Sequence, residues 1–471
     1  MKINEFKIHK LTLNKILIFS IIIATLGFIT DFKNTFKYGG MDLRNRVIGA
    51  RLLIDGADPY YHKWDETMSE RFLDPHDCPL APVNRVTVPP TVLTLHSIIA
   101  SLHYKIQRII WFIFQWVLFL LSLVLFSKST KLKYKSKLIW IIGLFFISGS
   151  YYWRLHVEKG QIYILYVFLI TLSFWLSQQN FKTSSFLSGF FIGLTASLRP
   201  PVIFMSIPLF IYKKWKLLLG NIIGLMMGLS SSFILGNISV WKKYSSAMQI
   251  WGKIHLGIIS RRHDGFSQIS AEGLDNLTIL ADIPLHDSSL QYVFKTFLGI
   301  SLSSNLLIIF LGFSILFFSI FMYNSRNKHV SIGNVFLIGI TLVFLCEFFI
   351  PAARLSYNDI IWLIPLSLII INYDLIKLLL NPVSVLLLLS IIFSTSFHLI
   401  TCHWLISDYA MLLFTISIVL LFLRDTNIFQ NNSMIYTDDI KNKPVIATII
   451  TIKEIINNMN DQNIECSNYE K

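Results

Sequence analysis

The residues best suited to chemistry gather in short polar segments between long apolar stretches. Asp42, Glu158, Lys159, Arg199 and Asp359 are the main examples, and their segments span residues 41–44, 156–161, 198–201 and 354–359. A carboxylate can act as a general base, and a guanidinium can hold a phosphate through two parallel hydrogen bonds. Ionisable groups at a bilayer boundary cost free energy unless they are used, so the segments predict a polar site on one face of a membrane.

The composition indicates a membrane protein. Hydrophobic residues make up 54% of the chain and charged residues 14%, whereas charged residues reach about 25% in soluble domains. Uncharged stretches long enough to cross a hydrocarbon core of roughly 30 Å recur at 109–127, 160–181, 217–241, 296–325 and 378–407. With the shorter runs, hydropathy predicts an all-α polytopic membrane protein of about twelve transmembrane helices.

Short lysine-rich loops predict the orientation. The positive-inside rule makes the N-terminal lysines, the run from Lys128 to Lys137, the Lys213 to Lys216 loop and the Arg326 to Lys328 loop cytoplasmic. No small-x-small cleavage site lies near Thr30, so the first apolar stretch is expected to remain as a span. Alternation across the membrane then places residues 31–108, 151–160, 198–201, 237–300, 351–359 and 398–404 outside.

Two segments are expected to be helices at the outer interface. Counting residues 88–101 as a span would place the lysine-rich loop from Lys128 to Lys137 outside the cell. These residues are therefore assigned to the membrane surface. In residues 43–54, an apolar stripe is flanked by arginines; it comprises Leu43, Val47, Ala50 and Ile54, with Arg44 and Arg51 on one side and Arg46 on the other. The predicted domains are a transmembrane domain, 1–424, with large outer loops at 31–108 and 237–300, and a polar cytoplasmic tail, 425–471, with an amphipathic stretch at 445–457.

Several function classes are disfavoured. The net charge of +14 is spread over many loops, which anionic lipid headgroups explain, so no nucleic-acid partner is expected. Walker, Rossmann and Gly-x-Ser-x-Gly motifs are lacking, so no nucleotide cradle and no cofactor are expected. No metal is expected either, because no histidine or cysteine has metal-ligand spacing; His156, His398 and His403 are interpreted as packed or interfacial, and Cys78 could bridge Cys402.

The candidate residues each have a structural alternative. Asp42 opens the predicted helix, so it is either an N-terminal cap or a base aimed at an acceptor hydroxyl. Arg199 either holds a phosphate or extends along the interface, and Lys159, Arg154 and Arg354 favour the interfacial alternative more strongly. Residues 58–60, Asp-Pro-Tyr, indicate a turn, and Glu347 is expected to pair with Arg354.

The order of several short motifs resembles glycosyltransferase family 87. The motifs are Asp42, Gly-Ala-Asp-Pro-Tyr at 56–60, Val-Pro-Pro at 88–90, Gly-Gln at 160–161, and Gly189 and Gly193 before Leu-Arg-Pro at 198–200. Members are bacterial polyprenyl-phosphate-mannose-dependent mannosyltransferases of the GT-C superfamily, and the resemblance covers about residues 15–370. It implies a GT-C-like bundle of about a dozen spans in which an acidic residue of the first outer loop serves the reaction. Asp42 is the matching position.

The chain departs from the family pattern at three places. Val88 replaces an aromatic residue, and Ile162-Tyr163 replaces a Val-Asn pair. Ser-Tyr-Asn-Asp at 356–359 stands where the family often has Ser-Trp-x-His. If that histidine takes part in proton transfer, Asp359 would have to replace it.

These observations together predict an enzyme of the bacterial plasma membrane with an extracytoplasmic active site. It would move mannose or a similar hexose or pentose from a polyprenyl-phosphate donor to a lipid-linked or cell-envelope glycan. The predicted site comprises the catalytic Asp42 and Asp359, the phosphate-binding Arg199, Lys159, Arg44 and Arg354, and the neighbouring Glu158, Gln161 and Tyr60. Membrane lipids, the sugar donor and a glycolipid or glycan acceptor are the expected partners.

Two alternatives to this function remain. One is a transporter or flippase for lipid-linked sugars, although the charges at the midplane and the two related halves typical of transporters are not evident. The other is an oligosaccharide ligase or polymerase, which the arginines of the loop 237–300 would also suit.

Overall fold

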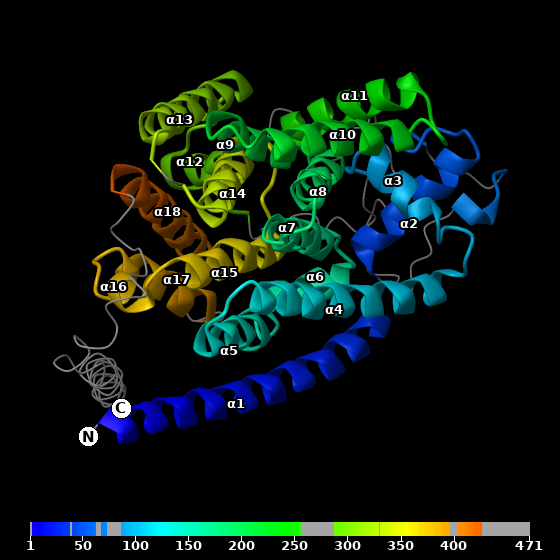
Figure 1. Ribbon diagram of the computed structural model, residues 1–471. Coiled ribbons are helices and arrows are strands. Elements are labelled where there is room, and N and C mark those ends of the chain that lie inside the picture. Colours follow the sequence, from blue (N-terminus) through cyan, green and yellow to red (C-terminus); the bar gives the residue numbers. More distant parts are fainter. Residues whose placement is uncertain are drawn as a thin grey trace, which may run out of the picture. The chain divides into compact units, whose positions relative to one another are not determined.

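The regular elements in the part of the chain that the structure describes are helices (Figure 1). The computed structural model describes residues 2–37, 40–62, 67–72, 86–255, 287–328, 330–395 and 403–425. Within these ranges no strand forms, and a single isolated bridge joins Asp287 to Leu355. The all-α prediction is confirmed. The tail 425–471, the proposed Cys78–Cys402 bridge and His398 fall outside the described residues, apart from Asp425.

The described helices occur in the following order along the chain. The first half of the chain forms α1 (Lys2–Lys37), α2 (Met41–Ile54), η1 (Glu70–Phe72), α3 (Pro90–Ser97), α4 (Tyr104–Lys128), α5 (Lys133–Ile141), η2 (Ile142–Ile147), α6 (Tyr151–Lys159), α7 (Tyr163–Ser177), α8 (Ser184–Leu198), η3 (Pro200–Met205), α9 (Ser206–Ile211) and α10 (Trp215–Ser231). The second half forms α11 (Ile238–His255), α12 (Leu290–Leu298), α13 (Ser304–Ser325), α14 (Ile332–Phe349), η6 (Ser356–Trp362), α15 (Leu363–Asn372), α16 (Leu375–Leu379), α17 (Ser384–Thr395) and α18 (His403–Arg424).

Among the residues that the structure describes, five helices are long and apolar enough to cross a membrane: α1 from Thr12, α4, α13, α14 and α18. The segment α5–η2 and the helix α6 pass the same test together but are bent by 68°. Other apolar helices are shorter; α7, for example, has 15 residues, which rise only about 22 Å against a hydrocarbon core of roughly 30 Å. The chain is therefore a membrane protein, and the count of about twelve spans stays a prediction.

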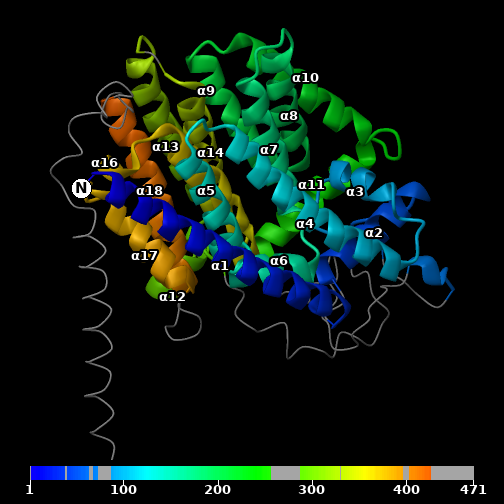
Figure 2. The ribbon, with the colours of Figure 1, turned by 60° about the horizontal axis from the view of Figure 1, so that its bottom comes forward.

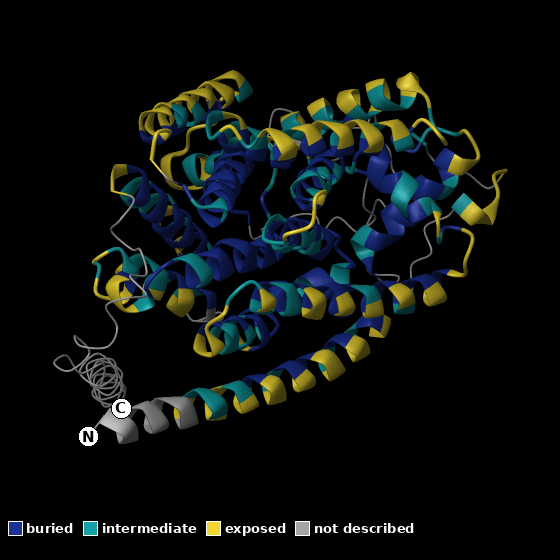
Figure 3. Cartoon of the chain, in the orientation of Figure 1, coloured by how far each residue is buried: buried dark blue, intermediate teal, exposed yellow. Residues whose placement is uncertain are grey.

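The spans differ in their surroundings. In α14, 89% of the most apolar window is buried inside the protein, whereas the values for α1 and α13 are 17% and 22% (Figure 3). Helix α1 runs along α4, α5 and α6 (Figure 2). It carries many exposed apolar side chains. A surface of this kind suits contact with lipid. Helix α14 is the central helix, and it contacts η3, α13, α15 and α18.

Glycines allow α8 and α10 to pack closely. A Cβ at Gly189 would lie 1.8 Å from the carbonyl oxygen of Leu217, and one at Gly193 would lie 1.9 Å from that of Asn221. Gly220 and Gly224 approach α8 equally closely from the other side. Small residues at this spacing let membrane helices bring their backbones together. The contact fixes the end of α8, where Arg199 follows.

Helices α2 and α3 form as predicted, but their side chains are placed differently. Arg44 and Arg46 of α2 are each only 1% exposed, whereas an interfacial helix would keep its arginines at the membrane surface. These two flanking arginines are therefore covered by protein, and the interfacial position of α2 stays a prediction. The physical reason for the burial of Arg44 and Arg46 is that α3, α6 and the 86–89 segment cover α2, and α3 in turn contacts α8, α10 and α11.

Candidate functional site

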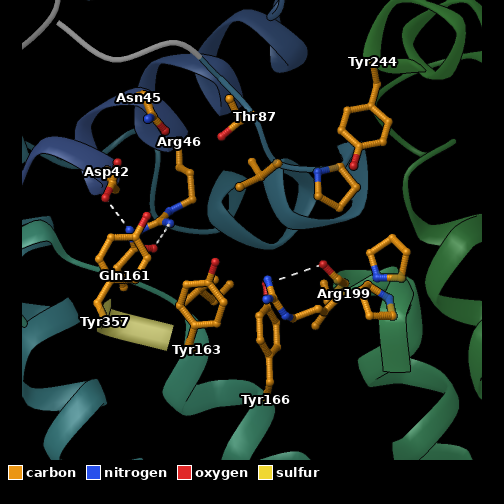
Figure 4. Close-up of a pocket in the computed structure, with 16 residues that line it drawn as sticks. Asp42, Asn45, Arg46, Thr87, Gln161, Tyr163, Tyr166, Arg199, Tyr244 and Tyr357 are labelled. Atoms are coloured by element: carbon orange, nitrogen blue, oxygen red, sulfur yellow. Dashed lines mark hydrogen bonds between the residues drawn. The ribbon is translucent and has the colours of Figure 1, made fainter. Parts of the chain in front are cut away.

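A cavity of about 160 Å³ lies where several of the polar segments predicted from the sequence meet (Figure 4). Its walls come from α2, the segment 87–89, the start of α7, the α8–η3 junction, α11 and η6. The lining residues are Asp42, Asn45, Arg46, Thr87, Val88, Pro89, Gln161, Ile162, Tyr163, Tyr166, Leu198, Arg199, Pro200, Pro201, Tyr244 and Tyr357. Segments far apart in the sequence thus share one site.

Asp42 lies on one side of the cavity. It accepts a hydrogen bond from Nε2 of Gln161, and Oε1 of Gln161 accepts one from Nη1 of Arg46 at 3.4 Å. Asp42 and Arg46 are one helical turn apart, so both can face the cavity. The N-cap residue of α2 is Gly40, and Asp42 lies in the first turn of this helix. Asp42 therefore does not occupy the N-cap position that the cap alternative requires.

Gly160 and Gln161 hold this side together. Gly160 ends α6 with φ 69°, a left-handed conformation that favours glycine. A Cβ there would lie 2.7 Å from Cβ of Leu43, so only glycine lets α2 approach this closely. The carbonyl oxygen of Gln161 accepts from Nε2 of Gln115 at 2.8 Å and from Nε1 of Trp111 at 3.2 Å. The Gly-Gln motif therefore positions the amide that contacts Asp42.

Arg199 lies on the other side of the cavity. Its Nε donates to Oε1 of Glu347 at 2.8 Å, and its guanidinium carbon is 4.4 Å from the ring centroid of Tyr163. No residue that the structure describes accepts a hydrogen bond from the two terminal amino groups of Arg199. The side chain is 18% exposed. A guanidinium held at one nitrogen and free at its outer edge can bind an anion in the cavity.

Tyrosines form much of the remaining wall. The ring of Tyr163 is 5.7 Å from those of Tyr166 and Tyr357, and Tyr166 donates to the carbonyl oxygen of Leu198 at 3.4 Å. Tyr244 reaches the cavity from α11 (Figure 4). Each ring offers an apolar face and a hydroxyl. This combination suits a ligand that has both CH groups and hydroxyls.

His96 is buried behind the Asp42 side. Its ring is 4.6 Å from that of Trp111, and neither ring nitrogen has a hydrogen-bond partner among the described residues. Burial, with a smaller contribution from the positive charge of Arg46, lowers the pKa of His96 well below 6.5. The imidazole is therefore neutral at pH 7.

Two predicted site residues lie in a separate cluster. Nη1 of Arg354 donates to Oδ1 of Asp359 and to Oγ of Ser288, both at 2.9 Å, and also contacts Asp408. All four side chains are buried, and none lines the cavity. The predicted pairing of Glu347 with Arg354 is confirmed at 4.0 Å, although Arg199 is the closer partner of Glu347.

The remaining predicted residues do not line the cavity. Nζ of Lys159 is 5.3 Å from the ring centroid of Tyr357, and Glu158 accepts a hydrogen bond from Asn34 of α1. Arg44 is buried in α2. The hydroxyl of Tyr60 donates to the carbonyl oxygen of Val88 at 2.9 Å, so Tyr60 supports the 87–89 wall.

Two smaller predictions are confirmed. The 58–60 turn forms, because Oδ1 of Asp58 accepts from the backbone amides of Tyr60 and Tyr61 at 2.9 and 3.2 Å. His156 is packed against Trp153, with the rings 5.6 Å apart. Within the described ranges, no group of three or more His, Cys, Asp or Glu side chains could hold a metal ion.

Sequence reasoning did not identify several cavity residues as part of the site. Arg46 could have been found, because it follows Asp42 by four residues on a predicted helix, and the i, i+3 spacing of Tyr163 and Tyr166 is a comparable signal. Nothing in the local sequence distinguishes Tyr244 or Thr87. Only the packing of α11 and of residues 86–89 brings these two to the cavity.

Comparison with known proteins identifies the family. The profile of glycosyltransferase family 87 matches residues 87–347, more than half of the chain. No curated protein and no solved structure matches. The matched region contains Gln161, Arg199 and Glu347, whereas Asp42 and Asp359 lie outside it. The chain therefore belongs to glycosyltransferase family 87 and is a membrane glycosyltransferase.

Proposed function

We propose that this glycosyltransferase moves a sugar from a polyprenyl-phosphate donor to a lipid-linked or cell-envelope glycan, in the cavity between Asp42 and Arg199. The observation that carries the proposal is that one cavity is lined by a carboxylate on one side and by an incompletely hydrogen-bonded guanidinium on the other. Transfer from a sugar phosphate needs both groups, one for the acceptor and one for the leaving group.

Arg199 would bind the donor phosphate. As the bond between C1 of the sugar and the phosphate oxygen breaks, negative charge grows on the polyprenyl phosphate, and a fixed cation stabilises it. The terminal amino groups of Arg199 are available for two parallel hydrogen bonds to this group. A polyprenyl donor keeps its tail in the bilayer, so an arginine beside membrane helices suits it.

Asp42 would act as the base. The acceptor hydroxyl attacks C1 of the sugar, its proton passes to Asp42, and polyprenyl phosphate leaves. Gln161 holds Asp42 toward the cavity. The tyrosine faces provide apolar surface for the ring of mannose or a similar sugar, and their hydroxyls can bond to its oxygens.

A transfer assay tests the donor class. Purified protein in liposomes is given radiolabelled mannosyl-phosphoryl-polyprenol and an acceptor glycolipid extract, and GDP-mannose is supplied in a parallel sample. We expect a labelled glycolipid product only with the lipid donor. Product from GDP-mannose alone, or movement of intact lipid across the bilayer without a new glycosidic bond, would contradict the proposal.

The side of the membrane has its own test. We propose that the cavity faces the extracytoplasmic side, because only this placement leaves the short lysine-rich loops inside. The test uses a background without the native cysteines, and both chosen positions are exposed on the protein. An impermeant thiol reagent applied to intact cells should label Ser239→Cys and should not label Lys133→Cys. Labelling of Lys133→Cys alone would place the cavity on the cytoplasmic side.

A further inference from the structure

Glu347 stands between two arginines in the centre of the protein. Its carboxylate is buried in α14, where Oε1 accepts from Nε of Arg199 at 2.8 Å and Oε2 lies 4.0 Å from Nε of Arg354. The side chain is 3% exposed and does not line the cavity. Glu347 therefore reaches the site only through Arg199.

The contact constrains how Arg199 can point. A carboxylate bonded at Nε fixes the inner edge of the guanidinium, so the terminal edge is directed away from Glu347. The ring of Tyr163, 4.4 Å from the guanidinium carbon, restricts rotation about the side chain. Pro200 also restricts the backbone conformation of Arg199, which directly precedes it.

Glu347 is itself held by a rigid support. Arg354 is bonded to Asp359, Asp408 and Ser288, and its guanidinium carbon is 4.4 Å from the ring centroid of Phe348, the neighbour of Glu347. Neither Oε2 of Glu347 nor Nε of Arg354 has a hydrogen-bond partner among the described residues. Arg354 thus attracts Glu347 electrostatically without competing for the oxygen that contacts Arg199.

We infer that Glu347 is a positioning residue, which aims the terminal edge of Arg199 at the donor phosphate and is anchored for this task by the Arg354 cluster. The inference rests on the proposed role of Arg199 in binding that phosphate. In this inference Arg354 and Asp359 anchor Glu347 and do not contact the substrate. A purely structural role for Glu347, in which the ion pair only allows two charges to be buried, is the alternative.

A double-mutant cycle separates the two roles. Glu347→Gln keeps an oxygen that can accept from Arg199 but removes the charge, and Glu347→Asp keeps the charge but withdraws it by one methylene. Values of kcat and of KM for the polyprenyl-phosphate sugar are measured per folded enzyme, in the native background and with Arg199→Ala. If Glu347→Gln does not fold, Glu347→Asp carries the measurement.

We expect either Glu347 variant to lower kcat/KM for the donor by about tenfold or more in the native background, since misaligned groups lose their catalytic effect steeply. With Arg199→Ala the further loss should be less than about twofold, because the group that Glu347 aims is gone. Asp31→Asn is the matched control. Asp31 is a buried carboxylate that accepts from Nε1 of Trp153 at 3.0 Å and pairs with Arg154, so its loss should lower stability and leave kcat/KM unchanged.

Equal losses of kcat/KM in both backgrounds would overturn the positioning role. So would full activity of both single Glu347 variants, if the single Arg199→Ala variant is inactive. Near-normal turnover of Arg199→Ala would instead overturn the proposed role of Arg199, and with it the basis of the inference.

Discussion

Two polar clusters among the described residues use the same residue types in different surroundings. In the first, Asp42 and Arg46 share the amide of Gln161 beside a cavity. In the second, Arg354 is enclosed by Asp359, Asp408 and Ser288, and no member lines the cavity. The buried charges of Arg46 and Arg354 are tolerated because each guanidinium has hydrogen-bond partners.

The difference indicates where chemistry can occur. A carboxylate whose neighbours leave one side facing a cavity can receive a proton from a ligand, whereas one enclosed by a guanidinium and a tryptophan ring cannot reach one. Asp408 is in the second situation, because Nε1 of Trp362 donates to it at 3.2 Å, and Asp359 is buried against the same guanidinium of Arg354. We therefore interpret the cavity cluster as reactive and the Arg354 cluster as its support.

The largest effect is expected at Arg199. Arg199→Ala removes the cation proposed to stabilise the leaving phosphate, and kcat/KM for the donor should fall roughly 100- to 1000-fold. Radiolabel transfer by purified enzyme measures it. Arg71→Ala is the control, because Arg71 is a surface residue paired with Asp55 at 3.3 Å and should leave transfer unchanged. Comparable activity in the two variants would remove Arg199 from the site.

A moderate effect, of a different kind, is expected at Asp359. Asp359→Asn weakens a charge-assisted hydrogen bond in the closed cluster, which should cost about 1–3 kcal/mol of unfolding free energy. The apparent Tm in detergent should drop, while transfer per folded enzyme should fall much less than with Arg199→Ala. If Asp359 replaces the family histidine as a base, transfer would fall by two orders of magnitude at an unchanged Tm, and the comparison of the clusters would fail.

The smallest effect concerns pH. Burial lowers the pKa of folded His96 well below 6.5, so below pH 6.5 the unfolded chain takes up a proton that the folded chain does not. Stability from this group is complete above pH 6.5 and should decline by up to about 1.4 kcal/mol per pH unit below it. His96→Phe should flatten the apparent Tm between pH 7 and pH 5 relative to the native protein. An identical pH dependence in both would show that His96 contributes nothing.

Much of the fold could be predicted from sequence because hydrophobic length and lysine-rich loops act locally. The helical class and the long spans α1, α4 and α13 follow from composition and apolar runs. The burial of Arg44 and Arg46 could not be predicted in this way. A flanking arginine looks the same in sequence whether lipid or protein covers the helix, and here α3, α6 and residues 86–89 cover α2.

The site was predictable in part, because some of its residues stand in local sequence motifs. Asp42, Gln161 and Arg199 stand in recognisable motifs, and all three line the cavity. Asp359 and Arg354 stand in an equally polar segment but turn into a closed cluster with Asp408 of α18. Asp408 is distant from both residues in sequence. Only the packing of α18 in the folded protein therefore shows that Asp359 and Arg354 belong to the supporting cluster and not to the cavity.

The most direct test of the account is Asp42→Asn measured beside Asp55→Asn. Asparagine keeps an oxygen that can accept from Gln161 but cannot serve as a base, and Asp55 is the acidic residue that follows the other end of α2. We predict that transfer by Asp42→Asn falls by about two orders of magnitude or more at an unchanged apparent Tm, while Asp55→Asn transfers normally. Full transfer by Asp42→Asn would contradict the central claim that the cavity between Asp42 and Arg199 is the reactive site.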